Sequence, residues 1–562
     1  MNRFVLIFFR LNFDSILIGS AAFLFLLPLN IINPFNVQWI LQFSGIADIG
    51  FTWLGWVFFK DTALFQFPLF QNSNYGFAEG SNIIFSGSIP LLGIILKPFS
   101  AIIPSDFQYF GLWIYLSFIM QSYFSKKILG SFSTDKILVF LMTILFVVSP
   151  IFLHRVYIPH IGLLAQWILL FAIYLLLRKD FSYKIWFLNL LIALLVHGYL
   201  FMFSFILFNF DLLLKNKVKL KLDSLKIIYL YLGIFSFMAL FGYFAHDSLG
   251  LIGGFGYYSM NLNSIINPSG LGVPYSDWSI LIPALESREL SKFYADYEGF
   301  NYLGIGALVL LPFALVKIVA LVEIIKRNKK KVFILSLMSF LLLLISVSNH
   351  IGFGSSSFVI DINSELYSKL SIFRASGRFF WINYYLIFCL LFVLITRSYP
   401  RKVSICIFLF AISLHLLDSV RSYEMIRDRF AKKVEYDKSS LDIGYNSILW
   451  TGISKKYKEI NIVYPGEIPK NEDLFRLCYF AAKNGIKINS GYFARVNRKK
   501  LEHEKERLSN IFETGLLDEN VLYVIDNKVM WEDLKERFDG KLYFKEAGTL
   551  MLVSISDICS LT

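Results

Sequence analysis

The residue best placed for acid–base chemistry is a single carboxylate, Asp48, in a long polar and aromatic segment. Asp48 precedes the run FTWLGWVFF, which is typical of a short helix at a membrane interface. A carboxylate at headgroup depth can accept a proton from a hydroxyl group while a phosphate leaves, which is general-base catalysis. The alternatives are a helix N-cap or a solvated loop aspartate.

Two arginines, Arg374 and Arg378 in RASGRFFW, are candidates for phosphate binding. Their spacing of four predicts a shared helix face, and guanidinium groups match phosphate oxygens well. The small residues between them would let a headgroup approach closely. The alternative is that the arginines pair with a loop carboxylate such as Asp361 or Glu365.

Further ionisable residues lie at the ends of apolar stretches: His154, Arg155 and His160 follow Ser149-Pro150, and His197 lies in VHGYLF. Charged groups at membrane depth are costly and often mark a site or an ion pair. At a helix–loop edge the cost is small because the side chain can reach water. For His197, a buried imidazole bonded to a backbone carbonyl is the alternative.

The stretch FPLFQNSNYGFAEGSN contains Asn74, Tyr75 and Glu79, which we expect to contact sugar hydroxyls. The same residues are also ordinary turn formers.

Other classes of protein are disfavoured by composition and by missing motifs. The chain is 56% apolar and 17% charged, whereas a soluble domain is about 45–50% apolar and about 25% charged. The net charge of +13 arises from bases that flank apolar stretches, so we expect no nucleic-acid partner. Phosphate-loop, GxSxG, HExxH and CxxC motifs are absent from the sequence, which argues against nucleotide hydrolysis and zinc chemistry.

The elements that position these residues are long apolar stretches, each close to the roughly 20 residues of a transmembrane helix. His197-Gly198 divides one long stretch into two short spans. We expect about eleven spans, at residues 14–32, 108–125, 137–153, 160–178, 185–196, 199–214, 226–246, 300–325, 332–348, 378–396 and 402–418.

The charges of the loops predict the orientation. Lysine and arginine are concentrated in short loops on one side and are sparse in the longer loops on the other, which places the N-terminus in the cytoplasm and the C-terminal region outside. Residues 83–103 are apolar but contain Pro90 and Pro98. We expect this segment to be re-entrant or to lie at the interface, because a further span would invert the later loops.

Three regions follow. Residues 1–106 hold the first span and a large outward loop with interface helices, residues 107–418 hold the other spans, and residues 419–562 are polar. In the last region, INIVYPG and VLYVID predict strands, residues 471–484 and 497–513 predict helices, and LYFKEAGTLMLVSIS predicts a hairpin turning at Ala547-Gly548. This alternation indicates a soluble α/β or α+β domain.

The motifs D-x₄-WLGWVFF, FPL-x₄-NYG-x₃-GSNIIFSGSIPLL, FQYFGLW and RASGRFFW resemble a bacterial polytopic family of the type C glycosyltransferase superfamily, whose members use polyprenyl-phosphate-linked sugars. The resemblance covers most of residues 30–420. It implies that Asp48 is the catalytic base. Members often carry a paired acidic motif there, whereas Asp48 has Ala47 and Ile49 as neighbours. The resemblance therefore does not establish whether a divalent cation binds or whether the chain is active.

The resemblance implies an inverting transferase in the bacterial inner membrane that acts on its periplasmic side. It would move a sugar from a lipid-phosphate co-substrate to an envelope glycan, lipid or protein acceptor. Arg374, Arg378 and Arg155 would hold the donor phosphate. The alternatives are a lipid-linked oligosaccharide flippase and an inactive scaffold of envelope assembly.

Overall fold

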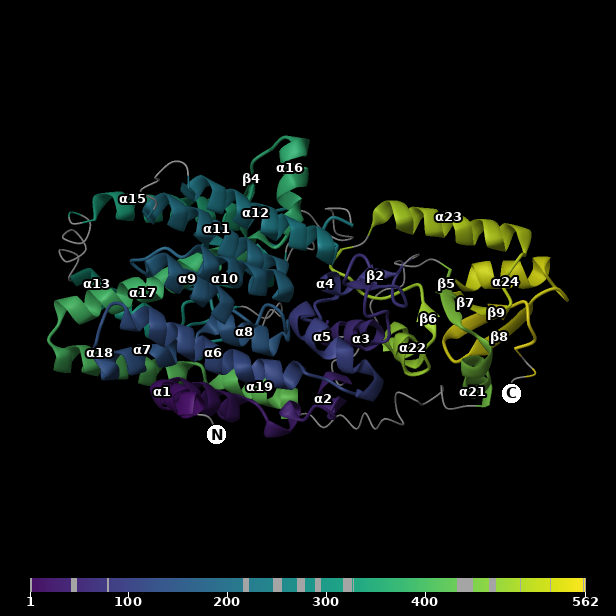
Figure 1. Ribbon diagram of the computed structural model, residues 1–562, viewed down its shortest axis with the longest axis horizontal. Coiled ribbons are helices and arrows are strands. Elements are labelled where there is room, and N and C mark those ends of the chain that lie inside the picture. The colour runs from purple at the N-terminus through teal and green to yellow at the C-terminus, as the bar shows by residue number, and fades with distance from the viewer. Residues whose placement is uncertain are drawn as a thin grey trace. The chain divides into compact units, whose positions relative to one another are not determined.

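The structure is a computed structural model that describes residues 3–41, 48–77, 80–215, 222–245, 255–269, 278–288, 295–316, 326, 328–431, 448–463, 472–495, 497–525, 527–558 and 560. Figure 1 labels its helices and strands. The chain divides into two compact units. Unit 1 comprises Met1–Leu29, Leu112–Ile234 and Ile252–Ala431, and unit 2 comprises Asn30–Gly111, Phe235–Leu251 and Lys432–Thr562.

Unit 1 is built mainly of helices, of which α6 and α12 extend into unit 2. Its helices are α1 (Arg3–Leu26), α6 (Phe110–Gly130), α7 (Lys136–Val147), α8 (Pro150–Tyr157), α9 (Trp167–Leu177), α10 (Tyr183–Val196), α11 (Gly198–Lys215), α12 (Leu222–Phe241), α13 (Ile305–Val316), α15 (Lys329–Val347), α16 (Ser364–Leu370), α17 (Phe380–Ser398), α18 (Arg401–Asp418) and α19 (Val420–Ala431). A hairpin of β3 (His350–Phe353) and β4 (Ser356–Val359) and four short 3-10 turns complete it, η3 (Leu262–Ile265), η5 (Asp296–Gly299), η6 (Ser371–Phe373) and η7 (Ser376–Phe379).

Each of the eleven predicted stretches contains a helix. Among the described residues, five helical segments have the required length and hydropathy, and the bent pair α18–α19 makes a possible sixth. The five are Lys136–Tyr157, Gly198–Lys215, Ser224–Phe241, Lys329–Val347 and Ser376–Ser398. The count of about eleven spans therefore remains a prediction.

Local sequence explains several helix boundaries. Asp135 accepts hydrogen bonds from the first free amides of α7, and Ser182 caps α10 in the same way. Pro150 starts α8, where its missing N–H costs nothing. His197 is extended, with φ −163°, and separates α10 from α11, which confirms the predicted break.

Unit 2 combines the loop after α1 with the C-terminal region. Its first part holds η1 (Leu29–Ile32), α2 (Gln38–Leu41), α3 (Ile49–Lys60), β1 (Gln71–Asn72), β2 (Ser81–Asn82), α4 (Ile83–Ser86), α5 (Pro90–Leu96) and η2 (Lys97–Ile102). The C-terminal part holds α21 (Ile448–Lys456), β5 (Glu459–Ile462), α22 (Glu472–Lys483), β6 (Lys487–Ile488), α23 (Arg498–Thr514), β7 (Val521–Ile525), α24 (Lys528–Arg537), β8 (Tyr543–Ala547) and β9 (Leu550–Ser554).

The C-terminal part forms a mixed five-stranded sheet in the order β6-β5-β7-β9-β8 (Figure 1). β5 runs parallel to β6 and β7, whereas β9 is antiparallel to both β7 and β8. Both predicted strands, both predicted helices and the terminal hairpin are confirmed. Phe512, Tyr523 and Trp531 contribute to the core between the sheet and its helices.

The first loop covers the edge of this sheet. Gly76 donates its amide to the carbonyl of Ile488 at 3.0 Å, and the amide of Ile488 donates to the carbonyl of Asn74 at 3.0 Å. Tyr75 between them is fully buried and stacks on Phe58 of α3 with ring centres 4.7 Å apart. These contacts protect an edge strand that would otherwise present free backbone groups.

The aromatic helix α3 also packs inside unit 2. All twelve of its residues are buried. Phe51 contacts Phe475 of α22 edge-on, with ring centres 5.6 Å apart, and Trp53 lies against Tyr479 of the same helix. The sequence predicts an interface helix here, whereas the structure surrounds α3 with protein.

Candidate functional site

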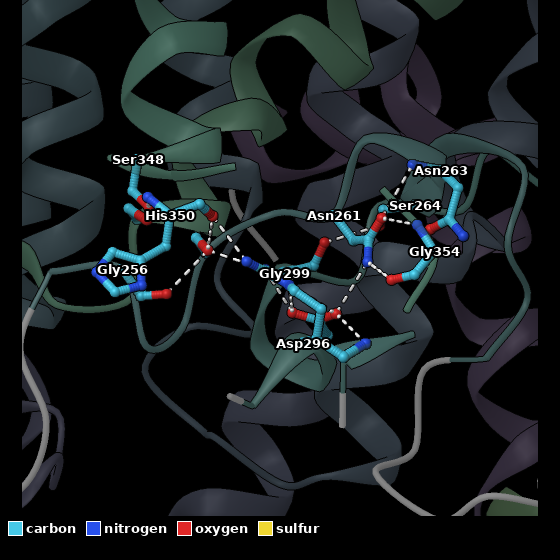
Figure 2. A network of polar contacts seen from close by, with 12 residues as sticks. Gly256, Asn261, Asn263, Ser264, Asp296, Gly299, Ser348, His350 and Gly354 are labelled. Carbon is cyan, nitrogen blue, oxygen red and sulfur yellow. Dashed lines mark hydrogen bonds and ion pairs between the residues drawn. The ribbon is translucent and has the colours of Figure 1, made fainter. Parts of the chain in front are cut away.

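The segments of unit 1 that connect α12 to α13 and α15 to α17 are joined by a polar network around Asp296 (Figure 2). Arg288 donates from Nη2 to Asp296 Oδ1 at 2.6 Å and from Nη1 to the carbonyl of His350 at 2.7 Å. Asn261 donates to Asp296 Oδ2 at 3.1 Å and to the carbonyl of Gly354 at 2.8 Å. Both charged side chains are buried. The network therefore fixes η5, the turn that begins with Asp296.

Two glycines set the position of Glu298, which lies two residues after Asp296 on this turn. Gly299 and Gly377 lie so close that a Cβ on Gly377 would fall 2.5 Å from the Cα of Gly299. Asn301 donates to the carbonyls of both glycines, at 2.8 and 3.1 Å. Because Glu298 and Arg378 adjoin these glycines, the contact brings their side chains together.

Glu298 is the centre of a buried ion-pair cluster. Its Oε2 accepts from Nη2 of Arg155 at 2.8 Å, from Nη2 of Arg378 at 2.7 Å and from Nε of Arg378 at 3.0 Å. The three side chains are between 1% and 11% exposed. The two arginines come from α8 and η7, so the cluster ties together segments far apart in the sequence.

The carboxylate is held in its ionised form. Burial alone would raise the pKa of Glu298, but the charges of Arg155 and Arg378 hold that pKa well below its usual range. The ionised Glu298 therefore contributes its full stabilisation of the fold above its unfolded-state pKa of about 4.3. This stabilisation is lost as the pH falls below that value and through the folded-state pKa. A carboxylate held in this way is a poor general base.

His160 extends the cluster. Its Nδ1 lies 2.9 Å from Nη1 of Arg155. A guanidinium group has only donors, so Nδ1 accepts and the ring proton lies on Nε2. The same Nδ1 is 3.9 Å from Glu298, too far for a hydrogen bond.

The cluster carries more positive than negative charge. Arg155, Arg378 and Glu298 together have a formal charge of +1 among the described residues. Nε of Arg155 is buried without a hydrogen-bond partner in the part of the chain that the structure describes. Buried charges are normally paired, so the arrangement suits an additional anion.

Aromatic rings border the cluster. The guanidinium carbon of Arg378 lies 4.7 Å from the ring centre of Tyr199, and that of Arg155 lies 5.3 Å from Trp381. Arg374 lies 5.5 Å from the ring centre of Tyr258. Such cation–π contacts stabilise desolvated guanidinium groups.

Two details of the arginine motif differ from the sequence-based expectation. Arg374 and Arg378 do not share a helix face, because Arg374 ends η6 and Arg378 belongs to the separate turn η7. The space left by the small side chain of Gly377 is filled by Gly299 rather than left open for a headgroup.

His197 lies beside the cluster. Burial of the ring, together with the charges of Arg378, His160 and Arg155, lowers the pKa of His197 to about 3. Its Nδ1 accepts from the amide of Tyr199 at 3.2 Å. His197 is therefore neutral at physiological pH and holds the start of α11.

The other predicted substrate-binding residues lie elsewhere. His154 is buried between Phe300 and Trp278, with ring centres 4.8 and 6.1 Å away. Asn74 and Tyr75 belong to unit 2 and connect the first loop to the C-terminal sheet. Glu79 lies outside the described residues.

Asp48 also belongs to unit 2. It occupies the N-cap position of α3, is partly exposed, and does not use its carboxylate to cap the first helical amides. Two residues later, Gly50 lies directly against Phe475 of α22. The role of Asp48 as the catalytic base stays a prediction.

The sequence did not single out Glu298. The candidate partners named for the arginines were Asp361, which is exposed, and Glu365, which pairs with Lys369 on the surface. Glu298 stands 143 residues from Arg155 and 80 from Arg378. The only local signal is an acidic residue directly before GFNYLGIGALV.

Replacing Gly377 by alanine is expected to disturb the cluster. The added methyl group would overlap Gly299, and overpacking of this kind costs about 1–3 kcal/mol. Thermal unfolding in detergent measures the loss. Gly130→Ala is the control, because its Cβ would meet nothing within 4 Å, and an equal loss in both variants would contradict the proposed contact.

The described part of the chain holds no group of three or more His, Cys, Asp or Glu residues that could bind a metal ion.

Fold and site together define a mostly helical protein with several helices long and apolar enough to cross a membrane, a C-terminal sheet-containing region and a buried cationic cluster. The chain belongs to the family described as "Domain of unknown function (DUF6311)", whose model matches residues 16–419. The model "DUF6311 C-terminal domain" matches residues 449–555. No curated protein and no solved structure matches the chain.

Proposed function

We propose that this chain is an integral-membrane glycosyltransferase of the bacterial inner membrane. It transfers a sugar from a polyprenyl-phosphate-linked donor to an envelope glycan, lipid or protein on the periplasmic side. The observation that carries the proposal is the buried, net-positive cluster of Arg155, Arg378 and Glu298. The transfer reaction itself is inferred from the motif resemblance.

The cluster has the properties of a phosphate site. Guanidinium groups bind phosphate through several charge-assisted hydrogen bonds, and burial strengthens them. Glu298 and the neighbouring rings orient Arg155 and Arg378 before a ligand arrives, which lowers the cost of binding. Such fixed charges would also stabilise the phosphate as it leaves the sugar.

The reaction is a single displacement. Asp48 removes the proton of an acceptor hydroxyl, and that oxygen attacks the anomeric carbon. The bond from this carbon to the phosphate oxygen breaks, its electron pair stays on the phosphate, and the configuration inverts. Glu298 is a positioning residue in this scheme, because its low pKa makes it a poor base.

A deletion strain provides the first test. We expect it to accumulate a lipid-linked sugar and to lack one sugar on an envelope component, when lipids and glycans are compared with those of the parent strain. Complementation with wild type should restore both, and complementation with Arg378→Met should restore neither. Loss of lipid translocation in reconstituted vesicles without loss of transfer would point to a flippase instead.

A further inference from the structure

Unit 2 exposes a patch of large apolar side chains at the C-terminal end of α3. Phe65 is 89% exposed, Phe67 is 77% exposed and Ile102 is 81% exposed. The patch, which we call the 65/102 patch, comes from residues 62–67 and from α5 and η2. Its further exposed members are Leu64, Ile95 and Phe99. Exposed apolar patches on a folded protein commonly mark an interaction surface.

A buried lysine joins the two halves of the patch. Lys97, only 3% exposed, donates from Nζ to Oγ1 of Thr62 at 2.7 Å. The same Nζ lies 3.8 Å from the ring centre of Phe59. Among the described residues no carboxylate forms an ion pair with Lys97. A buried ammonium group without a counter-charge is unfavourable unless an anion joins it.

The patch adjoins the end of a candidate membrane span within unit 2. The amide of Leu69 donates to the carbonyl of Leu240 at 2.9 Å, and Asn82 donates to the carbonyl of Phe241 at 2.8 Å. Both acceptors lie in the last turn of α12, whose apolar segment runs from Ser224 to Phe241. The loop that carries the patch is therefore held at the level where this span ends.

We propose that the 65/102 patch inserts into the membrane surface and that Lys97 binds the phosphate of an anionic lipid headgroup. Phe65, Phe67 and Ile102 would lie among acyl chains, and Lys97 would lie at phosphate depth. Aromatic residues and lysines favour this arrangement at membrane interfaces. Continuity with the apolar α12 favours a lipid surface over a protein partner. This inference does not depend on the transfer reaction.

A fluorescent depth measurement tests the proposal. Full-length variants Phe65→Cys, Ile102→Cys and Leu516→Cys, each in a background without the native cysteines, are labelled with an environment-sensitive dye in nanodiscs. Leu516 is the control, because it is 77% exposed but lies in the C-terminal part of unit 2. Brominated lipid chains should quench the dye at least twofold at residues 65 and 102 and leave residue 516 unchanged. Quenching at 65 and 102 by aqueous iodide alone would overturn the insertion.

The headgroup is tested in the same nanodiscs. Brominated phosphatidylglycerol should quench residue 65 more strongly than brominated phosphatidylcholine. This preference should vanish in Lys97→Met and persist in Lys97→Arg, which keeps the charge. A preference unchanged in Lys97→Met would overturn the role of Lys97. Loss of the preference on addition of inorganic phosphate would assign the site to a soluble anion and overturn the lipid headgroup.

Discussion

Glu298→Gln is expected to lower the free energy of unfolding by about 3–5 kcal/mol, because it removes the partner of two buried charges. Arg155 and Arg378 would then face each other without a counter-charge, and their repulsion would loosen the contact between η5 and η7. Chemical unfolding of the purified protein in detergent, followed by fluorescence, measures this loss.

Added ligand distinguishes a charge defect from a packing defect. A phosphate-bearing lipid should restore part of the lost stability, by about 2.7 kcal/mol at one hundred times its dissociation constant. The control is Glu365→Gln, which removes an exposed pair with Lys369 and should cost no more than about 0.5 kcal/mol. Equal losses in the two variants would contradict the central position of Glu298.

Asp48→Asn is expected to reduce sugar transfer by about 10²–10⁴-fold, the usual contribution of a general base. The amide keeps the size of the side chain but cannot accept the proton of the acceptor hydroxyl. Because asparagine has nearly the same shape as aspartate, stability and expression should stay unchanged. Transfer of a radiolabelled sugar by the reconstituted protein is the measurement.

The same helix supplies the matched control for this variant. Asp61 is the residue at the other end of α3, is half exposed and pairs with Lys60. Asp61→Asn changes charge by the same amount and should retain wild-type turnover. Undiminished transfer in Asp48→Asn would remove this residue from the mechanism, and equal defects in both would show a general charge effect.

The secondary structure was largely predictable because it depends on local patterns. Apolar stretches gave helices, and the break at His197-Gly198 and the terminal hairpin follow from short-range sequence. The lengths of the helices, and therefore the number of membrane spans, follow less directly from the sequence than the positions of the helices. Helices such as α9 and α10 are apolar but shorter than a span requires, and apolar composition alone does not reveal where a helix ends.

The order of segments along the chain does not show which of them assemble into unit 2. The sequence separates the first loop from the C-terminal region by more than three hundred residues, whereas Tyr75 and Ile488 are neighbours on one sheet edge. Turn-forming residues such as Asn74 and Gly76 look alike whether they bind a ligand or cover a strand. Only the packing of Tyr75 on Phe58 separates the two roles.

The candidate site was predicted in part. Arg155 and His160 were singled out because charges near apolar helices are costly, and Arg378 because guanidinium groups match phosphate oxygens. The structure brings the three residues together. Glu298 was missed because its partners are distant in sequence. His154 was predicted by the same reasoning to bind substrate, but its ring packs against Phe300 instead. An ionisable residue near an apolar helix can therefore be a packing residue.

Binding of a polyprenyl phosphate without its sugar, measured by native mass spectrometry, tests the central claim most directly. Wild type should bind it, and Arg155→Met and Arg378→Met should each bind at least about tenfold more weakly, because buried charge contacts are worth about 2–5 kcal/mol. Arg401→Met, which alters an exposed pair with Asp135, should bind like wild type. Equal affinity in all four proteins would show that the Glu298 cluster is not the phosphate site.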